Sequence, residues 1–303
     1  MEARRLQEQR FLEAQHRFLQ RHGVDAKPSF IPIPSLEGYA QVLTTGQGLP
    51  VVMLNGIGTP AAMWAPLIGQ LTGLRIHAVD LPGYGLTDVR PSLTRELRER
   101  AVRFLNEVLV GLELKESAFV ANSLGSLWTT WFALDHPDKI SRIVHIGCPA
   151  LVLGTSAPLP MRLLANRVLG RLMTRIQPPS RAQVVQLGKM VNQHPLDEEL
   201  IDLLVETERL PHFRGTLLAM LHRLIRLRGS RPSMALTSEQ LAEVEAPTLV
   251  LWGDEDPFGD VGVGRRMAEA MPNAELHVVR GGHAPWLSDT RRAAELANHF
   301  LHA

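Results

Sequence analysis

Short apolar runs alternate with longer amphipathic stretches through most of the chain. Runs typical of buried strands lie at residues 51–54, 74–79, 117–121, 143–146, 248–252 and 276–279. Between them lie stretches such as residues 93–112, where apolar side chains recur every three or four positions as in a helix. Strands that alternate with helices predict crossover connections and a parallel sheet. We therefore expect an α/β fold, with a mostly parallel sheet and helices on both faces.

The alternation stops between residues 150 and 235. This segment has helical spacing broken by prolines, and the next strand pattern begins at residue 248. Open α/β sheets bind ligands at the carboxyl ends of their strands, so a helical insertion between strands predicts a cap over that edge. We expect three parts: an N-terminal helical extension (1–23), a core (24–149 and 236–303) and a helical cap (150–235).

The first 23 residues predict a polar helix with a thin apolar stripe, formed by Leu6, Phe11, Leu12, Phe18 and Leu19. We interpret it as a solvated leader helix, with packing on the body of the protein or on a partner as the alternative. The segment is too charged for a secretory signal, and no run in the chain approaches the roughly 18 apolar residues of a membrane span.

The composition is typical of a globular protein. The chain has 303 residues, of which 45% are apolar and 21% charged, with a formal net charge of +1. This nearly neutral balance gives no overall positive potential that would attract a nucleic acid. Cys148 is the only cysteine, which excludes an intrachain disulfide. We expect a cytoplasmic protein with no cofactor and no metal, and a homodimer stays an open alternative.

Three short passages carry the candidate chemistry, and each follows an apolar run. They are Ala-Asn-Ser-Leu-Gly at 121–125, Leu-Trp-Gly-Asp-Glu-Asp-Pro at 251–257 and Gly-Gly-His-Ala-Pro at 281–285. The resulting chain order Ser, Asp, His is the order of a Ser-His-Asp hydrolase on an α/β sheet. We predict Ser123 as nucleophile, His283 as base and Asp256 as the acid that orients the base.

Each of these assignments has a competitor. Ser123 could be a helix N-cap, but Ala121 and Gly125 supply the small residues that a strained nucleophile turn requires. Residues 145–151, after the preceding strand, hold no carboxylate, so the acid is sought in the 251–260 loop. We choose Asp256 over the other acids of that loop, Asp254, Glu255 and Asp260. Among 12 histidines, His283 is distinguished by the two glycines before it.

These residue types match the needs of acyl transfer. A serine hydroxyl is a weak nucleophile at neutral pH, so an imidazole must take its proton as the oxygen attacks a carbonyl. The imidazole later returns that proton to the leaving group. A carboxylate behind the imidazole selects its tautomer and stabilises the imidazolium.

With the loops Asn55-Gly56 and Asp80-Leu81-Pro82-Gly83-Tyr84-Gly85, these motifs make the chain resemble the α/β-hydrolase superfamily, in the branch with a helical cap. The resemblance covers residues 38–303 and implies the α/β-hydrolase fold. It also implies that the backbone N–H groups of Ile57 and Leu124 form an oxyanion hole. The chain departs from the common pattern at Asn55, where many members have histidine, and at Ala121, where most have glycine.

The type of nucleophile limits the reactions that the chain could catalyse. Haloalkane dehalogenases and epoxide hydrolases of similar fold use an aspartate, so a serine argues against both. We expect a serine hydrolase, a carboxylesterase that cleaves a small-molecule ester through an acyl-enzyme. One alternative is a carbon–carbon hydrolase of vinylogous diketones, which the string 122–125 resembles. Such enzymes usually carry an aromatic residue directly after the histidine, where this chain has Ala284. Another alternative is a non-catalytic small-molecule receptor.

The cap carries a charge asymmetry. Residues 151–235 hold 12 basic and six acidic side chains, a net charge of +6. We interpret this as an arginine-covered surface, with steering of anionic substrates as the alternative. The apolar side chains of residues 161–173 predict a helix face that contacts the acyl group. We expect the substrate pocket to be lined by Leu163, Leu164, Val168, Leu172 and Trp286.

Overall fold

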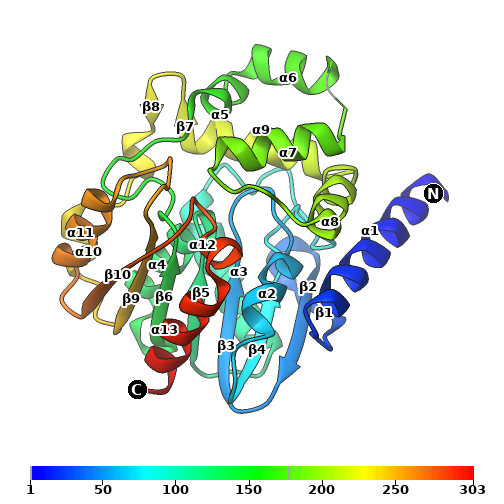
Figure 1. The fold of residues 1–303 in the computed structure, drawn as a ribbon. Helices are drawn as coiled ribbons and strands as arrows, with labels where there is room; N and C mark the ends of the chain where they lie inside the picture. The colour runs from blue at the N-terminus through cyan, green and yellow to red at the C-terminus, as the bar shows by residue number, and fades with distance from the viewer. Residues whose placement is uncertain (1, 177) are drawn as a thin grey trace.

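The computed structural model describes residues 2–176 and 178–303. In this part of the chain an eight-stranded sheet forms the centre of the molecule (Figure 1). Its order is β1-β2-β4-β3-β5-β6-β9-β10, and all neighbours are parallel except the pairs β1–β2 and β2–β4. The strands are β1 (Lys27–Ile33), β2 (Gly38–Gly46), β3 (Leu49–Leu54), β4 (Leu74–Val79), β5 (Ser117–Ala121), β6 (Ile140–Ile146), β9 (Thr248–Gly253) and β10 (Ala274–Val279).

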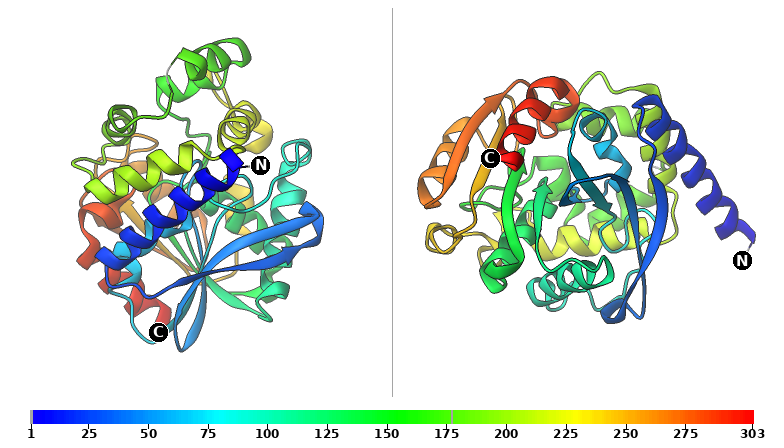
Figure 2. Two further views of the ribbon diagram at one scale, coloured as in Figure 1. Left: turned by 90° about the vertical axis from the view of Figure 1, so that its right-hand side faces the viewer. Right: turned by 90° about the horizontal axis from the view of Figure 1, so that it is seen from below.

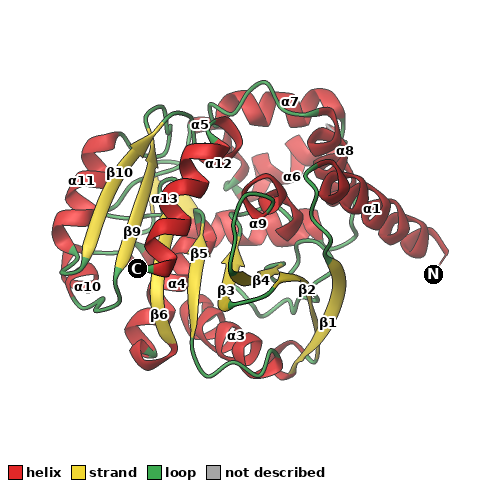
Figure 3. Ribbon diagram, turned by 60° about the horizontal axis from the view of Figure 1, so that its bottom comes forward, coloured by secondary structure: helices red, strands yellow, loops and turns green. Residues whose placement is uncertain are grey.

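Helices cover both faces of this sheet (Figure 3). Helices α3 (Leu97–Gly111) and α4 (Leu124–Asp135) pack together on one face. Helices α2 (Ala65–Ile68) and α13 (Thr290–His302) pack together on the other. The remaining core elements are η1 (Pro34–Leu36), η2 (Ala61–Trp64), η3 (Pro137–Lys139), α10 (Ser238–Ala242), α11 (Val261–Ala270) and α12 (Pro285–Ser288).

The central strands are buried on both sides. Every residue of β5 and of β9 is buried, as are residues 51–54 of β3. Parallel strands covered on both faces read as continuous apolar runs, and this is the pattern from which they were predicted. The predicted fold class is confirmed.

The segment between β6 and β9 lies over one end of the sheet (Figures 1 and 2). It holds the helices α5 (Leu159–Leu164), α6 (Arg167–Ile176), α7 (Arg181–Met190), α8 (Glu198–Glu208) and α9 (Phe213–Leu224), followed by the hairpin β7 (Ile225–Arg226) and β8 (Gly229–Ser230) and by η4 (Pro232–Met234). We call α5 to β8 the cap. The prolines that interrupt the helical pattern separate these short elements, because proline cannot continue a helix.

The predicted N-terminal helix forms as α1 (Glu2–Arg21), but it is not a solvated leader. Phe11 and Phe18 are fully buried. The buried amide of Gln41 on β2 donates to the side chain of Gln15 at 2.9 Å. Helix α1 also packs on α8 of the cap. The apolar stripe is thin because α1 needs only one narrow face to pack against the rest of the protein.

No helix in the described ranges combines the length and the apolar character that crossing a bilayer requires.

Phe18→Ala should lower the free energy of unfolding by about 3–5 kcal/mol, because removing a buried ring leaves a cavity. Urea unfolding followed by circular dichroism measures this change. Leu6→Ala is the matched control on the same helix, since Leu6 is 49% exposed and should change stability little. Equal unfolding curves for the two variants would contradict the packing of α1.

Candidate active site

Ser123, Asp256 and His283 come together at one edge of the sheet. Ser123 directly follows β5, Asp256 lies in the loop after β9, and His283 lies in the loop after β10. These strands run parallel, so their carboxyl ends meet at the same edge. All three residues are buried, and Ser123 and His283 border a cavity beneath the cap.

Ser123 occupies a strained turn. Its φ of 51° and ψ of −110° fall in a region that residues other than glycine rarely adopt. The turn is crowded, because a Cβ at Gly125 would lie 2.5 Å from the carbonyl oxygen of Leu54. The Ser123 side chain forms no capping hydrogen bond to α4, so the N-cap interpretation is wrong. The turn instead holds the hydroxyl at the cavity.

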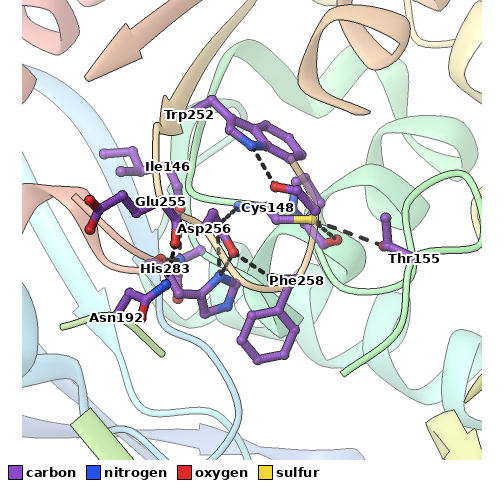
Figure 4. A network of polar contacts seen from close by, with 12 residues as sticks. Ile146, Cys148, Thr155, Asn192, Trp252, Glu255, Asp256, Phe258 and His283 are labelled. Atoms are coloured by element: carbon purple, nitrogen blue, oxygen red, sulfur yellow. Dashed lines mark hydrogen bonds and ion pairs between the residues drawn. The ribbon is translucent and has the colours of Figure 1, made fainter. Parts of the chain in front are cut away.

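The imidazole of His283 pairs with the carboxylate of Asp256 (Figure 4). Nδ1 of His283 lies 2.9 Å from Oδ2 and 3.1 Å from Oδ1 of Asp256. The carboxylate also accepts the backbone N–H of Cys148 at 2.8 Å and that of Phe258 at 2.9 Å. Four acceptor contacts hold this buried carboxylate in place. Nε2 of His283 is buried and has no hydrogen-bond partner among the described residues.

The other acids of this loop have different partners. Asp254 accepts the backbone N–H of Gly281 at 2.8 Å, and Asp260 caps α11 by accepting the N–H of Val263 at 3.0 Å. Glu255 is exposed. Of the four candidate acids, Asp256 is the one that the structure places against His283.

Two further side chains contact His283, Phe258 at its ring and Asn122 at its backbone carbonyl, and neither was predicted as a site residue. The ring of Phe258 stacks on His283, with centroids 4.0 Å apart and an angle of 27° between the planes. The amide of Asn122 donates to the carbonyl oxygens of Ile146 at 2.7 Å and of His283 at 3.0 Å. Phe258 lies two residues after Asp256 and Asn122 lies directly before Ser123, and this closeness in the sequence was the available signal. Both restrict how the histidine loop can move.

Residues of the cap hydrogen-bond to the loops that carry Asp256 and His283. The backbone N–H of His283 donates to the carbonyl of Val191 at 3.0 Å, directly after α7. The Asn192 side chain donates to the carbonyl of Glu255 at 2.8 Å (Figure 4). The Gln193 side chain donates to Ser288 at 2.8 Å. Residues 191–193 therefore tie the cap to both the acid loop and the histidine loop, a connection for which the sequence offered no signal.

The loop after β3 lies on the other side of Ser123. A Cβ at Gly56 would lie 3.1 Å from that of Ser123, so this loop approaches the nucleophile closely. The Asn55 amide donates to the carbonyl of Pro60, within the same loop. Asp80 accepts the backbone N–H of Ala61 at 2.6 Å, and complete burial raises the pKa of Asp80 to about 7.

The two predicted oxyanion donors border this space. Ile57 and Leu124 both line a small cavity beside Ser123. Within the described ranges, neither backbone N–H donates to a protein acceptor. This arrangement leaves both groups available to a ligand oxygen, and their role stays a prediction.

The cavity that Ser123 and His283 border has a volume of about 180 Å³ and is mostly apolar. Its cap side is formed by residues of α5, α7, α8 and α9, among them Met161, Leu164, Leu187, Leu204 and Leu217. Among the described residues, no group of three or more His, Cys, Asp or Glu side chains is placed to hold a metal ion.

Of the five predicted pocket residues, only Leu164 lines this cavity, and the other four expectations are wrong. Leu163 lies on α5 outside the lining, while Val168 and Leu172 are 74% and 52% exposed on α6. The reason is a break in the predicted helix: Asn166 accepts the N–H groups of Val168 and Leu169 and starts α6 as a new helix. Its apolar residues consequently point away from the pocket.

Trp286 is also outside the cavity. It is fully buried and stacks on Trp64, with ring centroids 4.2 Å apart. Its indole N–H donates to the carbonyl of Met63 at 3.2 Å. Trp286 therefore packs in the core next to the histidine loop and does not line this cavity.

Glu208 is the unexpected member of the pocket wall. It follows Leu200 and Leu204 on α8 at four-residue spacing, so all three share one helix face and line the cavity. Burial raises the pKa of Glu208 to about 7. The sequence shows this carboxyl group within an apolar helical stripe. The pattern alone does not tell whether such a stripe lines a pocket.

Comparisons with known proteins agree with this fold. Residues 50–290 match the family model of the alpha/beta hydrolase fold. The chain is 32% identical to 2-hydroxy-6-oxononadienedioate/2-hydroxy-6-oxononatrienedioate hydrolase of Cupriavidus pinatubonensis, covering 80% of this chain and 83% of that protein. It is 27% identical to pimeloyl-(acyl-carrier protein) methyl ester esterase of Vibrio atlanticus, covering 81% of this chain and 91% of that protein.

Solved structures show the same fold. Carboxylesterase CesB from Bacillus subtilis superimposes with a TM-score of 0.78 at 19% identity, over 97% of this chain and 98% of that one. A meta-cleavage product hydrolase from Pseudomonas fluorescens superimposes with a TM-score of 0.74 at 22% identity, over 90% and 97% of the two chains.

A fluorophosphonate probe should label the protein at Ser123, and Asp256→Asn should slow labelling roughly a thousandfold, because the histidine loses its orienting charge. Mass spectrometry of the labelled peptide and the labelling rate are the measurements. Ser126→Ala, three residues further on α4, is the control for Ser123→Ala and should label normally. Labelling that persists in Ser123→Ala would contradict the assignment.

Glu208→Gln should make the protein more stable than the wild type above about pH 7. The pKa of Glu208 is raised from 4.5 to about 7, so ionising it costs stability as pH rises between these values. The advantage of the variant should be absent below pH 4.5 and complete above pH 7. Thermal unfolding across this range measures it, with the exposed residue Glu243→Gln as control. Parallel pH profiles for wild type and Glu208→Gln would contradict the burial of this carboxyl.

Proposed function

We propose that this chain, which belongs to the α/β-hydrolase family, is a serine carboxylesterase that acts on esters of uncharged, apolar carboxylic acids. The observation that carries the proposal is the apolar cavity beside Ser123, in whose wall the described residues include no lysine or arginine.

The geometry supports an acyl-enzyme mechanism. Oγ of Ser123 attacks the ester carbonyl carbon while Nε2 of His283 takes the hydroxyl proton. The N–H groups of Ile57 and Leu124 stabilise the negative charge on the carbonyl oxygen. The tetrahedral intermediate collapses, the C–O bond breaks, and the alcohol leaves with the proton from His283. A water molecule then repeats the sequence on the acyl-enzyme and releases the acid.

Asp256 selects the tautomer of His283 that this cycle needs. Because its carboxylate accepts from Nδ1 of His283, Nε2 is the nitrogen left to face the cavity as a base. The imidazolium formed during attack lies next to a full negative charge. The ring of Phe258 covers one face of the imidazole and shields this pair from solvent.

The charge of the cavity separates the candidate substrates. Among the described residues that line it, none is lysine or arginine, and the one ionisable carboxyl is Glu208. A substrate carboxylate placed here would lose its hydration without gaining a counter-ion, at a cost of several kcal/mol. A neutral acyl chain meets leucine and methionine side chains instead. The cavity, at about 180 Å³, exceeds the roughly 150 Å³ that accommodates benzene in an apolar protein core.

Carbon–carbon hydrolysis is the second candidate. In its favour stand the Asn122–Gly125 string and relatives such as the 32% identical hydrolase of 2-hydroxy-6-oxononadienedioate. The substrate in that name carries two carboxylates. Such a dianion fits poorly in a cavity whose ionisable side chain is an acid, and this favours the ester.

The test compares matched substrates. We expect kcat/KM for the nitrophenyl ester of a neutral short-chain acid to exceed that of the analogue whose chain ends in a carboxylate by roughly a hundredfold, because the second charge is desolvated unpaired. The same enzyme should cleave 2-hydroxy-6-oxononadienedioate more slowly than the neutral ester.

Ser123→Ala should abolish turnover, and Ser126→Ala should retain it. Faster cleavage of the dioate than of any ester would overturn the proposal in favour of the carbon–carbon hydrolase. Absence of turnover on both substrate classes would leave the chain as a small-molecule receptor.

A further inference from the structure

Helix α6 presents its apolar side to solvent. Val168 is 74% exposed, Leu172 52% and Ile176 73%, and these residues follow one another at four-residue spacing. Gly170 lies on the opposite side, where a Cβ would come within 2.2 Å of the Leu164 carbonyl oxygen and 3.0 Å of the Leu218 side chain. Helix α6 therefore packs on α5 and α9 through its small residue and leaves its larger apolar residues uncovered.

Neighbouring elements extend this surface. Leu159 at the start of α5 and Leu227 in the turn between β7 and β8 are also exposed, at 53% and 49%. Helix α5 packs on both α6 and β7, and Arg162 of α5 donates to the carbonyl of Leu227 at 3.5 Å. Figures 1 and 2 show α6 at the outer end of the cap. We call this surface the cap apex, defined by Leu159, Val168, Leu169, Leu172, Ile176 and Leu227.

The charges around the cap apex have one sign. Residues 151–196 contain six basic side chains and not one acid. Arg167, Arg171 and Arg175 are exposed and form a row on α6 directly beside the apolar row. In the described part of the chain they form no ion pair with a carboxylate, in contrast to Arg181, which pairs with Glu198 and Asp202.

We propose that the cap apex docks on the surface of an anionic lipid bilayer, with α6 lying in the headgroup layer. A helix with an exposed apolar row flanked by arginines is suited to this position, because the apolar side chains enter the acyl boundary while the guanidinium groups meet lipid phosphates. A second copy of the chain fits less well, since like-charged arginine rows would face each other. A nucleic acid would leave the apolar row without a partner.

The location of the apex connects docking to the pocket. Helix α5 begins at the exposed Leu159 and ends at Leu164, which lines the cavity, with Met161 between them also in the cavity wall. One turn of helix thus separates the bilayer-facing surface from the acyl pocket. This consequence, delivery of apolar esters from the bilayer, rests on the proposed function, whereas docking itself does not.

Co-sedimentation with vesicles tests docking separately from catalysis. The full chain carrying Ser123→Ala is mixed with vesicles of phosphatidylcholine alone or with added phosphatidylglycerol. We expect binding to the anionic vesicles and weak binding to the neutral ones. Replacing Arg167, Arg171 and Arg175 with glutamine should lower partitioning into anionic vesicles on the order of a hundredfold. Leu172→Ser with Ile176→Ser should lower it roughly tenfold or more.

The matched controls lie on α3, away from the cap. Arg103→Gln removes an exposed arginine there, and Val110→Ser removes an apolar side chain that is 67% exposed. Both should bind vesicles like the parent protein, and all variants should share its unfolding midpoint. Unchanged binding by the triple arginine variant would overturn the proposal. Absence of vesicle binding by the parent protein would also overturn it. In that case, dimers that Leu172→Ser with Ile176→Ser disrupts would indicate a second copy as the partner, and binding of duplex DNA would indicate a nucleic acid.

Discussion

The buried carboxylate of Asp256 is the group on which the arrangement of this site depends. A charge removed from water must be matched by donors, and here they come from three separate segments: Cys148 after β6, Phe258 in its own loop and His283 after β10. Each donor is delivered by a parallel strand that ends at the same sheet edge. The order of strands β6, β9 and β10 in the sheet thus determines which groups surround the carboxylate that positions the histidine.

The cap is joined to this same network. His283 donates its backbone N–H to Val191, and Asn192 holds the carbonyl of Glu255. A helical insertion that only covered the pocket would contact substrate and little else. The cap of this protein also restrains the two loops that position the base and its acid. Movement of residues 191–193 would therefore shift the imidazole. Helix α1 adds a second connection, because it packs on α8 of the cap and reaches β2 of the core through Gln15.

The cap has two apolar sides with different surroundings. The inner side, with Leu164, Leu204 and Leu217, closes a cavity in which Glu208 is the one ionisable carboxyl among the described lining residues. The outer side, at the cap apex, is apolar as well but is bordered by arginines that pair with no carboxylate among residues 2–176 and 178–303. Burial explains the apolar residues on the inside, whereas those on the outside fit the proposed docking on a bilayer, and the arginines indicate the charge of that partner.

The sequence by itself determined the features that depend on local constraints. The parallel sheet follows from apolar runs separated by helical spacing. The turn at Ser123 follows from the small residues Ala121 and Gly125, because a bulkier side chain at 125 would collide with the Leu54 carbonyl. The chain order of Ser123, Asp256 and His283 followed from motifs at strand ends. The pairing of Asp256 with His283, chosen among four acids, agrees with the structure.

Tertiary structure decided which side of each helix is covered. Helical spacing shows that Val168, Leu172 and Ile176 share a face, but it does not tell whether that face meets a pocket, the core or solvent. The break at Asn166 turned it outward, while the stripe Leu200, Leu204 and Glu208 turned inward. In the same way, the sequence did not tell that the side chains of Phe18 on α1 and of Trp286 are buried in the core. Periodicity is a property of one segment, whereas burial depends on the distant segments that pack against it.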